Sequence, residues 1–306
     1  MSKVLITGGT GFAGSHLVDY LKTQGDTVYI TSRTRTDINI INLDLLKIED
    51  IEKTLIDYQF DKIFHLTAQS SVNLSWKMPF QTLYDNINCT INLLKAIHEL
   101  KLTTRIILAS TCELYKTTNE RIYETHPIEP RNPYGYSKLV TDYLVSGISK
   151  DFKLNTTLLR LFNHVGPGQT DTFVLPSFTK QVAEIKMGLK EPVISVGNLE
   201  IKRDFVDVRD VCRAYSLVSN QDAYGEVYNV CSGKEYCLRD LLGKIINIAG
   251  IDVQVVVDPN KVRKVDIPTF YGSYDKINKV FGWEPYYTIE QTLADMYNWW
   301  LENLRN

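Results

Sequence analysis

The sequence lacks the features of a secreted, metal-dependent or membrane-spanning protein. Its five cysteines form no C-x-x-C pair, and an odd, scattered set in 306 residues favours reduced thiols over a disulfide framework. The five histidines lie far apart and show no metal-ligand spacing. No apolar run reaches the roughly 18 residues that a membrane helix needs, and the start MSKVLITGG shows no signal-peptide pattern. We therefore expect a cytoplasmic protein without a metal site and without a membrane partner.

An excess of charge of either sign is also missing. Lys and Arg number 34 against 36 Asp and Glu, which gives a formal net charge of -2. Nucleic-acid-binding domains usually carry a basic patch or stripe, so nucleic acid is not an expected partner. A site for an anionic ligand must therefore depend on a local group of basic residues. The length of 306 residues is sufficient for one large α/β domain or two lobes.

Apolar, β-rich runs alternate with helix-like stretches along the first half of the chain. Alternation of strands with helices of ten or more residues predicts βαβ units. We expect an α/β fold with a Rossmann-type, doubly wound parallel sheet that is covered by helices on both faces. The expected strands are 3–7, 27–31, 62–66, 105–109 and 156–161.

Near residue 163 the pattern changes to loops rich in Gly, Pro and Asn, FNHVGPGQTDTF. We expect residues 1–162, together with about 204–225, to form the NAD(P)-binding domain, with the strand and helix near 204–220 returning to the sheet. Residues 163–203 and 226–306 then form a smaller, C-terminal substrate-binding lobe.

A glycine-rich segment, TGGTGFAGSH, follows the first expected strand and opens a helix. Its Gly8, Gly11 and Gly14 suit a tight turn whose backbone approaches a pyrophosphate, with the anion bound by free amides at the helix N-terminus. The position after the first strand of an alternating α/β chain predicts dinucleotide binding.

The second expected strand ends in Ser32 and Arg33, with Arg35 nearby, where an NAD-binding loop usually carries an acid. A hydroxyl and a guanidinium suit the 2′-phosphate of NADP(H), which is the preferred cofactor. NAD(H) stays possible if these arginines are solvated loop charges. Asp44 follows the third short strand, where its carboxylate can accept a hydrogen bond from the adenine amine.

Two segments supply candidate catalytic groups. In RNPYGYSK, Tyr134 and Lys138 are four residues apart and share one face of a helix. Thr111 and Glu113 lie in LASTCELYK, after a strand whose carboxyl end belongs to the ligand-binding edge of a parallel sheet. We expect Lys138 and a cationic nicotinamide to lower the pKa of Tyr134, and Thr111 to donate a hydrogen bond to the substrate oxygen.

These motifs, together with HLTAQSSV at 65–72 and RDFVDVRD at 203–210, resemble the extended short-chain dehydrogenase/reductase (NAD-dependent epimerase/dehydratase) family over essentially the whole chain. Within it the sequence is most similar to the GDP-mannose branch, which contains 4,6-dehydratases and GDP-4-keto-6-deoxy-mannose reductases. FNHVGPGQTDTF and VRKVDIPTFYGS look most like the reductases. The chain departs from the family pattern at Cys89, Cys112 and Lys116, and we interpret Cys112 as a small filler rather than a nucleophile.

The resemblance implies a role for each site residue. Tyr134 is the acid/base, and Lys138 is its electrostatic partner and a ligand of the nicotinamide ribose. The implied cofactor ligands, with Tyr134 and Lys138, are Gly8, Gly11, Phe12, Ala13, Ser32, Arg33, Asp44, Leu45, Leu66 and Ala68.

The implied substrate ligands lie mostly in the second half of the chain. Asn163 contacts the sugar or diphosphate, Lys180 and Arg203 the nucleotide and its diphosphate, Arg263 the diphosphate, and Asp266 the nucleotide ribose. The full set is Ser70, Ser71, Asn163, Val174, Lys180, Arg203, Arg263 and Asp266.

The reaction stays open at this point. The first hypothesis is reduction of the C4 ketone of a GDP-4-keto-6-deoxy-mannose-type hexose or heptose, with Tyr134 as the acid. A GDP-mannose-type 4,6-dehydratase that uses Glu113 and a GDP-sugar 4-dehydrogenase are alternatives. A non-catalytic NADP(H)-binding sensor is a further alternative, against which the intact Thr111, Tyr134 and Lys138 argue.

Helices near 80–100 and 134–150 are apolar over more than one face. The family pairs these two helices across a dimer as a four-helix bundle, so the resemblance implies a homodimer.

Overall fold

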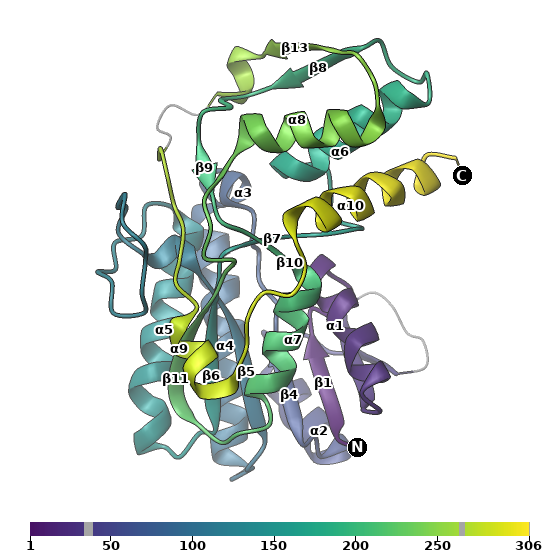
Figure 1. Cartoon of the computed structure of the whole chain (residues 1–306). Coiled ribbons are helices and arrows are strands. Elements are labelled where there is room, and N and C mark those ends of the chain that lie inside the picture. Colours follow the sequence, from purple (N-terminus) through teal and green to yellow (C-terminus); the bar gives the residue numbers. More distant parts are fainter. Residues whose placement is uncertain (34–38, 263–266, 306) are drawn as a thin grey trace.

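Seven parallel strands form the central sheet of the computed structural model, which describes residues 1–33, 39–262 and 267–305. Their order is β3-β2-β1-β4-β5-β6-β11, and the first six follow the Rossmann arrangement. The predicted doubly wound α/β fold is therefore confirmed (Figure 1). The strands are β1 (Lys3–Thr7), β2 (Thr27–Ser32), β3 (Ile40–Asn42), β4 (Lys62–His65), β5 (Arg105–Thr111), β6 (Thr156–Leu161) and β11 (Tyr224–Val230).

Helices cover both faces of this sheet, which is why β5 and β6 are buried almost throughout. One face packs against α1 (Phe12–Thr23) and α7 (Val208–Val218). The other face packs against α2 (Ile48–Tyr58), α4 (Pro79–Glu99) and α5 (Pro133–Asp151).

The sheet extends further along the chain than the sequence indicated. The short strand β10 (Phe205–Asp207) does not join it, because β10 pairs with β7 (Asn163–Val165) in a separate two-stranded sheet. The seventh strand is β11, whose apolar run VYNV pairs with β6 and crosses the expected boundary at residue 225. The division into two lobes stays a prediction, but the sheet itself continues to Val230.

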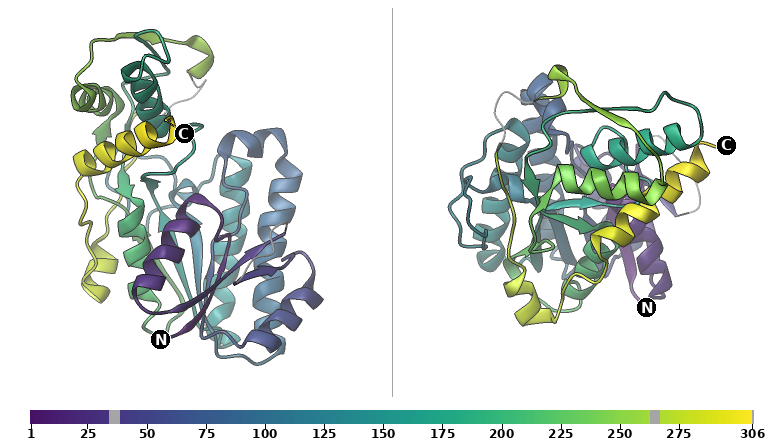
Figure 2. Two further views of the ribbon diagram at one scale, coloured as in Figure 1. Left: turned by 90° about the vertical axis from the view of Figure 1, so that its right-hand side faces the viewer. Right: turned by 45° about the horizontal axis from the view of Figure 1, so that its top comes forward.

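A second group of elements surrounds its own apolar cluster, built from α6 (Val174–Lys186), α8 (Leu238–Ala249) and α10 (Ile289–Asn303). These helices and the short strands beside them, called the small lobe below, lie above the carboxyl ends of the sheet strands (Figures 1 and 2). The short strands of this lobe are β8 (Val193–Val196), β9 (Lys202–Arg203), β12 (Tyr236–Cys237) and β13 (Gln254–Val257), and the remaining elements are α3 (Val72–Lys77), α9 (Asp275–Phe281) and the 3₁₀ turns Cys112–Leu114 and Pro259–Lys261.

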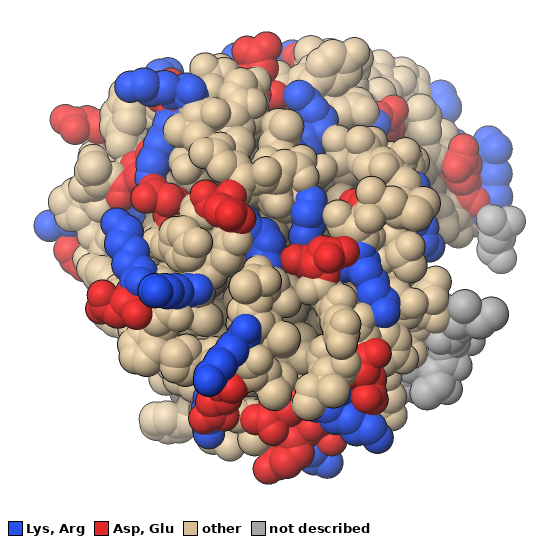
Figure 3. Space-filling view, turned by 90° about the horizontal axis from the view of Figure 1, so that it is seen from below, with Lys and Arg blue, Asp and Glu red and all other residues tan. Residues whose placement is uncertain are grey.

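The surface seen from the side opposite the small lobe carries charges of both signs. Lys and Arg side chains are interspersed there with Asp and Glu, in line with the balanced composition (Figure 3). Within the described part of the chain, no helix combines the length and the apolar character that crossing a bilayer requires.

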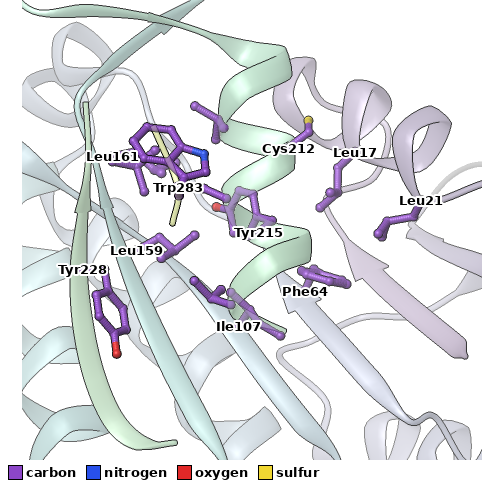
Figure 4. Close-up of a cluster of buried hydrophobic side chains, with 14 of the residues drawn as sticks. Leu17, Leu21, Phe64, Ile107, Leu159, Leu161, Cys212, Tyr215, Tyr228 and Trp283 are labelled. Atoms are coloured by element: carbon purple, nitrogen blue, oxygen red, sulfur yellow. The ribbon is translucent and has the colours of Figure 1, made fainter. Parts of the chain in front are cut away.

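Trp283 joins the C-terminal part of the chain to the core of the sheet. Its side chain is fully buried in the cluster between α7 and the strands (Figure 4). The indole Nε1 donates a hydrogen bond to the Asp210 carbonyl oxygen at 3.0 Å, which also ties Trp283 to α7. Burial of so large a side chain makes this position a sensitive probe of the sheet core.

We expect Trp283→Ala to lower the free energy of unfolding by about 3–5 kcal/mol, because it leaves a large cavity. Urea denaturation measures the change. Tyr286→Ala is the control: this aromatic side chain is 73% exposed, and its removal should cost less than about 1 kcal/mol. Equal losses in the two variants would contradict the role given to Trp283.

Candidate active site

The four predicted catalytic residues converge where β5 meets the first turns of α5. Thr111 ends β5, Glu113 follows in a 3₁₀ turn, and Tyr134 and Lys138 lie on α5. Asn132 caps α5 by accepting a hydrogen bond from the Gly135 amide at 2.8 Å, and Pro133 occupies the first helical position. The local sequence NPYG therefore fixes where α5 begins.

Tyr134 is 9% exposed. Burial raises the pKa of Tyr134 above its ordinary value, the neighbouring Thr111 hydroxyl lowers it, and the charge of Glu113 raises it further. Within the protein chain burial outweighs the contribution that lowers this pKa. The expected effect of Lys138 together with a cationic nicotinamide stays a prediction. Tyr134 thus holds its proton at neutral pH, as a proton donor must.

Lys138 is 5% exposed, and its ammonium group donates a hydrogen bond to the Ala109 carbonyl oxygen on β5 at 2.8 Å. Burial lowers the pKa of Lys138 to about 8, while the charge of Asp142 opposes the shift. An ammonium group has three donors, so two remain for groups at the site.

Glu113 is positioned by two contacts. Its amide donates to the Thr111 hydroxyl oxygen at 3.2 Å, and its carboxylate accepts from the Asn132 side-chain amide at 2.9 Å. The same Asn132 side chain therefore caps α5 and also donates a hydrogen bond that positions the Glu113 carboxylate. The sequence analysis missed this residue, although an Asn directly before a helix-starting Pro is a recognisable N-cap signal.

The phosphate loop has the close backbone packing that a pyrophosphate site needs. Gly8 has a positive φ of 76°, and a Cβ there would approach the Thr67 amide to 3.0 Å. A Cβ on Gly14 would collide with the Gly8 carbonyl oxygen. Gly11 is the N-cap of α1, and Phe12 and Ala13 form its first turn, where amide groups lack helical acceptors. These residues fit a dinucleotide.

The expected adenosine end lies at the edge of the sheet. Ser32 ends β2, and the exposed Arg33 lines a cavity of about 480 Å³ together with Asp44 and Lys47. Asp44 accepts from the Leu46 amide at 3.1 Å, so its carboxylate shapes the turn as well as facing this cavity. Leu45 is buried.

The segment after β4 is tied to α5 by a residue that the sequence analysis did not select. Leu66 and Ala68, which lie in this segment shortly before Gln69, are half-buried. Asn86 accepts from the Gln69 amide at 2.8 Å and donates to the Ser137 hydroxyl oxygen on α5 at 2.9 Å. The family-like segment N-x-x-x-T that begins at Asn86 was the available signal.

The predicted substrate residues occupy different local settings. Ser70 is exposed, and Ser71 caps α3 by accepting from the Leu74 amide at 3.2 Å. Val174 begins α6. Lys180 pairs with Asp171 at 2.7 Å and Glu184 at 3.8 Å, and its Nζ lies 5.3 Å from the Trp300 ring centroid.

Asn163 and Arg203 both lie next to Asp204, whose side chain is buried. The Asn163 amide donates to the Asp204 carbonyl oxygen at 3.0 Å, and Arg203 donates to the Ile267 carbonyl oxygen at 2.7 Å. The Asp204 side chain accepts from Ser232, Gly233 and Gly272. Arg263 and Asp266 lie outside the described residues.

Cys112 is buried against Tyr115 and Phe162, and burial raises the pKa of its thiol well above the ordinary value. A protonated thiol is a weak nucleophile, which agrees with its interpretation as a filler.

Comparison with known proteins gives concordant results. The family model described as GDP-mannose 4,6 dehydratase matches residues 5–296. A GDP-6-deoxy-D-mannose reductase from Pseudomonas aeruginosa is 32% identical, over 99% of this chain and 98% of the relative. A GDP-mannose 4,6-dehydratase from Yersinia enterocolitica is 28% identical, over 97% of this chain and 93% of the relative.

Solved structures agree in fold. The structure of RMD from Pseudomonas aeruginosa complexed with NADPH superposes with a TM-score of 0.90 at 31% identity, covering 99% of this chain and 100% of that one. A UDP-glucose 4-epimerase from Thermotoga maritima with UDP-glucose gives a TM-score of 0.88 at 28% identity, covering 99% of each chain. The chain therefore belongs to the GDP-mannose 4,6 dehydratase family, within the extended short-chain dehydrogenases/reductases.

Proposed function

We propose that this protein is a cytoplasmic, NADP(H)-dependent reductase of a GDP-sugar, which converts the C4 ketone of a GDP-4-keto-6-deoxy-mannose-type hexose or heptose to an alcohol. The observation that carries the proposal is the meeting of Tyr134 and Lys138, one helical turn apart on α5, with the end of β5, where Thr111 lies and where Lys138 donates to the Ala109 carbonyl oxygen. The 32% identity to the Pseudomonas aeruginosa reductase, over nearly the whole of both chains, supports this substrate class.

Each residue has a defined part in the reduction. Bound NADPH supplies hydride to C4 of the sugar. Thr111 holds the ketone oxygen beside Tyr134 by a hydrogen bond, and Tyr134 donates its proton to that oxygen as negative charge develops there. The Lys138 ammonium group then stabilises the phenolate that Tyr134 becomes.

Positive groups in the small lobe suit the diphosphate of the nucleotide sugar. The guanidinium group of Arg203 can donate two hydrogen bonds to one phosphate. Asn163 donates to the carbonyl oxygen of Asp204, the residue that follows Arg203. We assign the sugar or the diphosphate to Asn163, and the nucleotide and its diphosphate to Lys180 and Arg203. Ser70, Ser71 and Val174 are further proposed substrate contacts. Arg263 and Asp266 stay predicted ligands of the diphosphate and the ribose.

A 4,6-dehydratase is the second candidate, since the Glu113 carboxylate is held by Asn132 beside Thr111 and dehydratases are among the relatives. In that reaction Glu113 would remove the proton from C5, and the cofactor would be regenerated within each turnover. A GDP-sugar 4-dehydrogenase uses the same residues without Glu113.

We expect purified protein to oxidise NADPH when given GDP-4-keto-6-deoxy-mannose, with a gain of two hydrogens by the sugar in mass spectrometry. Tyr134→Phe should lower kcat by about 100- to 10,000-fold, because the general acid is removed. Glu113→Gln should leave the reduction largely intact, and Tyr123→Phe, at an exposed tyrosine, serves as the control. Loss of water from GDP-mannose without net cofactor change, abolished by Glu113→Gln, would instead establish the dehydratase.

The cofactor preference for NADP(H) rests on Arg33 and on Lys47 in the same cavity as Asp44. Acidic Asp50 and Asp57 line that cavity too, so we expect the Arg33 guanidinium to contribute most, among the described residues, to the preference for NADP(H). Relatives of known structure include complexes with NADPH and with NAD.

Arg33→Ala should raise KM for NADPH about 10- to 100-fold, because a charge-assisted hydrogen bond worth about 1.5–3 kcal/mol is lost. KM for NADH, which lacks the 2′-phosphate, should stay within about twofold and is the internal control. Equal effects on both cofactors would refute the assignment of Arg33 to the 2′-phosphate.

A homodimer through α4 and α5 is part of the proposal. Tyr136, Val140 and Tyr143 share one face of α5 and are 44–59% exposed, and Phe80 and Tyr84 form an exposed pair one turn apart on α4. The two helices pack against each other, so these exposed apolar side chains lie on adjacent helices and can form one surface for a second copy of the chain.

Tyr143→Lys should shift the protein from dimer to monomer in sedimentation velocity at micromolar concentration, because it places two like charges in a two-fold interface. Tyr286→Lys, at a 73% exposed tyrosine outside this face, should leave the dimer intact. A wild-type protein that sediments as a monomer would exclude the dimer.

A further inference from the structure

A buried ion pair lies directly behind the catalytic residues. Arg160 donates to both carboxylate oxygens of Asp142, with Nη2 to Oδ1 at 2.7 Å and Nε to Oδ2 at 3.0 Å. The Ser110 hydroxyl donates to Oδ2 at 2.8 Å. Arg160 also donates to the Tyr115 hydroxyl oxygen at 3.0 Å, and Asp142 and Arg160 are 1% and 5% exposed.

Stability alone does not account for such a pair. Removing two charges from water costs several kcal/mol for each ion, and well-packed apolar residues of similar volume are often as stabilising. Neighbouring positions on the same face of β5 and β6 show that this region does accept apolar side chains, for example Leu108 and Leu158. The contacts of this ion pair with neighbouring elements therefore indicate its role.

The pair joins the three elements that carry the site. Asp142 lies one turn after Lys138 on α5, and Arg160 lies opposite Ser110 in the register of β5 and β6. Ser110 directly precedes Thr111. The same cluster thus holds α5 against the end of β5, where Lys138 donates to Ala109.

The position of Asp142 relative to Lys138 is that of an ordinary helical ion pair. Residues four apart on a helix are neighbours, and a free carboxylate at Asp142 would attract the Lys138 ammonium group along α5. Both oxygens of Asp142 are instead occupied by Arg160 and Ser110, and Lys138 donates to β5.

Other titratable groups also face Lys138. Besides Asp142 and Tyr134 on its own helix, these are Cys89 on α4 and His65 on β4. Burial raises the pKa of Cys89 to about 11 and lowers the pKa of His65 to about 3, so both are uncharged at neutral pH. Asp142 is thus the one anion among these facing groups.

We propose that Arg160 and Ser110 hold the Asp142 carboxylate as a fixed counter-charge for Lys138, close enough to favour the ammonium form but unable to draw it away from the reacting groups. Asp142 is a positioning residue for Lys138 rather than a catalytic one. The proposal rests on the proposed function, in which Lys138 must be charged.

The consequence for pH dependence has a definite sign. The charge of Asp142 raises the pKa of Lys138, so its neutralisation lowers that pKa further below the ordinary value. The ammonium form would then be lost at a lower pH, and the alkaline limb of the activity profile would move in the same direction.

Asp142→Asn keeps the shape of the side chain and tests this directly. We expect the alkaline limb of kcat/KM for the ketone to move down by about one pH unit, so that turnover above the limb falls about tenfold, with the NADPH dissociation constant unchanged. An isotope-labelled lysine signal, assigned with Lys138→Arg, should show the same shift in NMR without any substrate.

The double variant Asp142→Leu/Arg160→Met covers the case in which Asp142→Asn, with its unpaired Arg160, fails to fold. It removes both charges together, so its unfolding free energy should stay near the wild-type value while the titration of Lys138 still moves down. A folded variant in which Lys138 titrates as in the wild type would overturn the proposal. Because the NMR titration needs no turnover, inactivity of the wild-type protein on the keto sugar would count against the proposed function alone.

Discussion

A charged lysine buried between α5 and β5 is the constraint on which the rest of the site depends. Lys138 is 5% exposed, and keeping its charge there requires an acceptor, which the Ala109 carbonyl supplies at the end of β5. That contact needs α5 to begin at a fixed residue, which the Asn132 cap and Pro133 provide. It also needs α5 to stay in register with the sheet, and the Asp142 and Arg160 pair joins helix to strand. The sheet, the helix cap and the buried ion pair are therefore parts of one electrostatic arrangement.

A second buried charged group, the Asp204 carboxylate, connects chain segments between the small lobe and the sheet. Asp204 is fully buried, and burial raises its pKa to about 6, although its carboxylate accepts hydrogen bonds from Ser232, Gly233 and Gly272. These donors come from the chain after β11 and from the segment that leads to α9. One carboxylate thus joins two chain segments beside Arg203, in the region where the sugar nucleotide is proposed to bind.

The local parts of this architecture were predictable from sequence, and the long-range parts were not. The alternation of strands and helices, the glycine turn after β1 and the four-residue spacing of Tyr134 and Lys138 depend on near neighbours in the chain. The assignment of β11 rather than β10 to the sheet depends on pairing with β6, for which the sequence carries no local signal. Asp142 and Arg160 meet only because α5 packs on β6. The rise in the pKa of Tyr134 has no local signal either, since burial is set by the whole fold.

The buried position of Trp283 has a consequence for how the chain folds as it is made. The cluster that covers one face of the sheet contains residues as early as Val4 and as late as Trp283, so it cannot close until nearly the whole protein has left the ribosome. Contacts of such large sequence separation form slowly, and the apolar face of β1, β4 and β5 remains open during synthesis. The opposite face contains Val227 from β11 only at its edge and is otherwise complete by Leu158. The nascent sheet should therefore be protected first on the side of α2, α4 and α5, and a chain released before Trp283 would present its other side to chaperones.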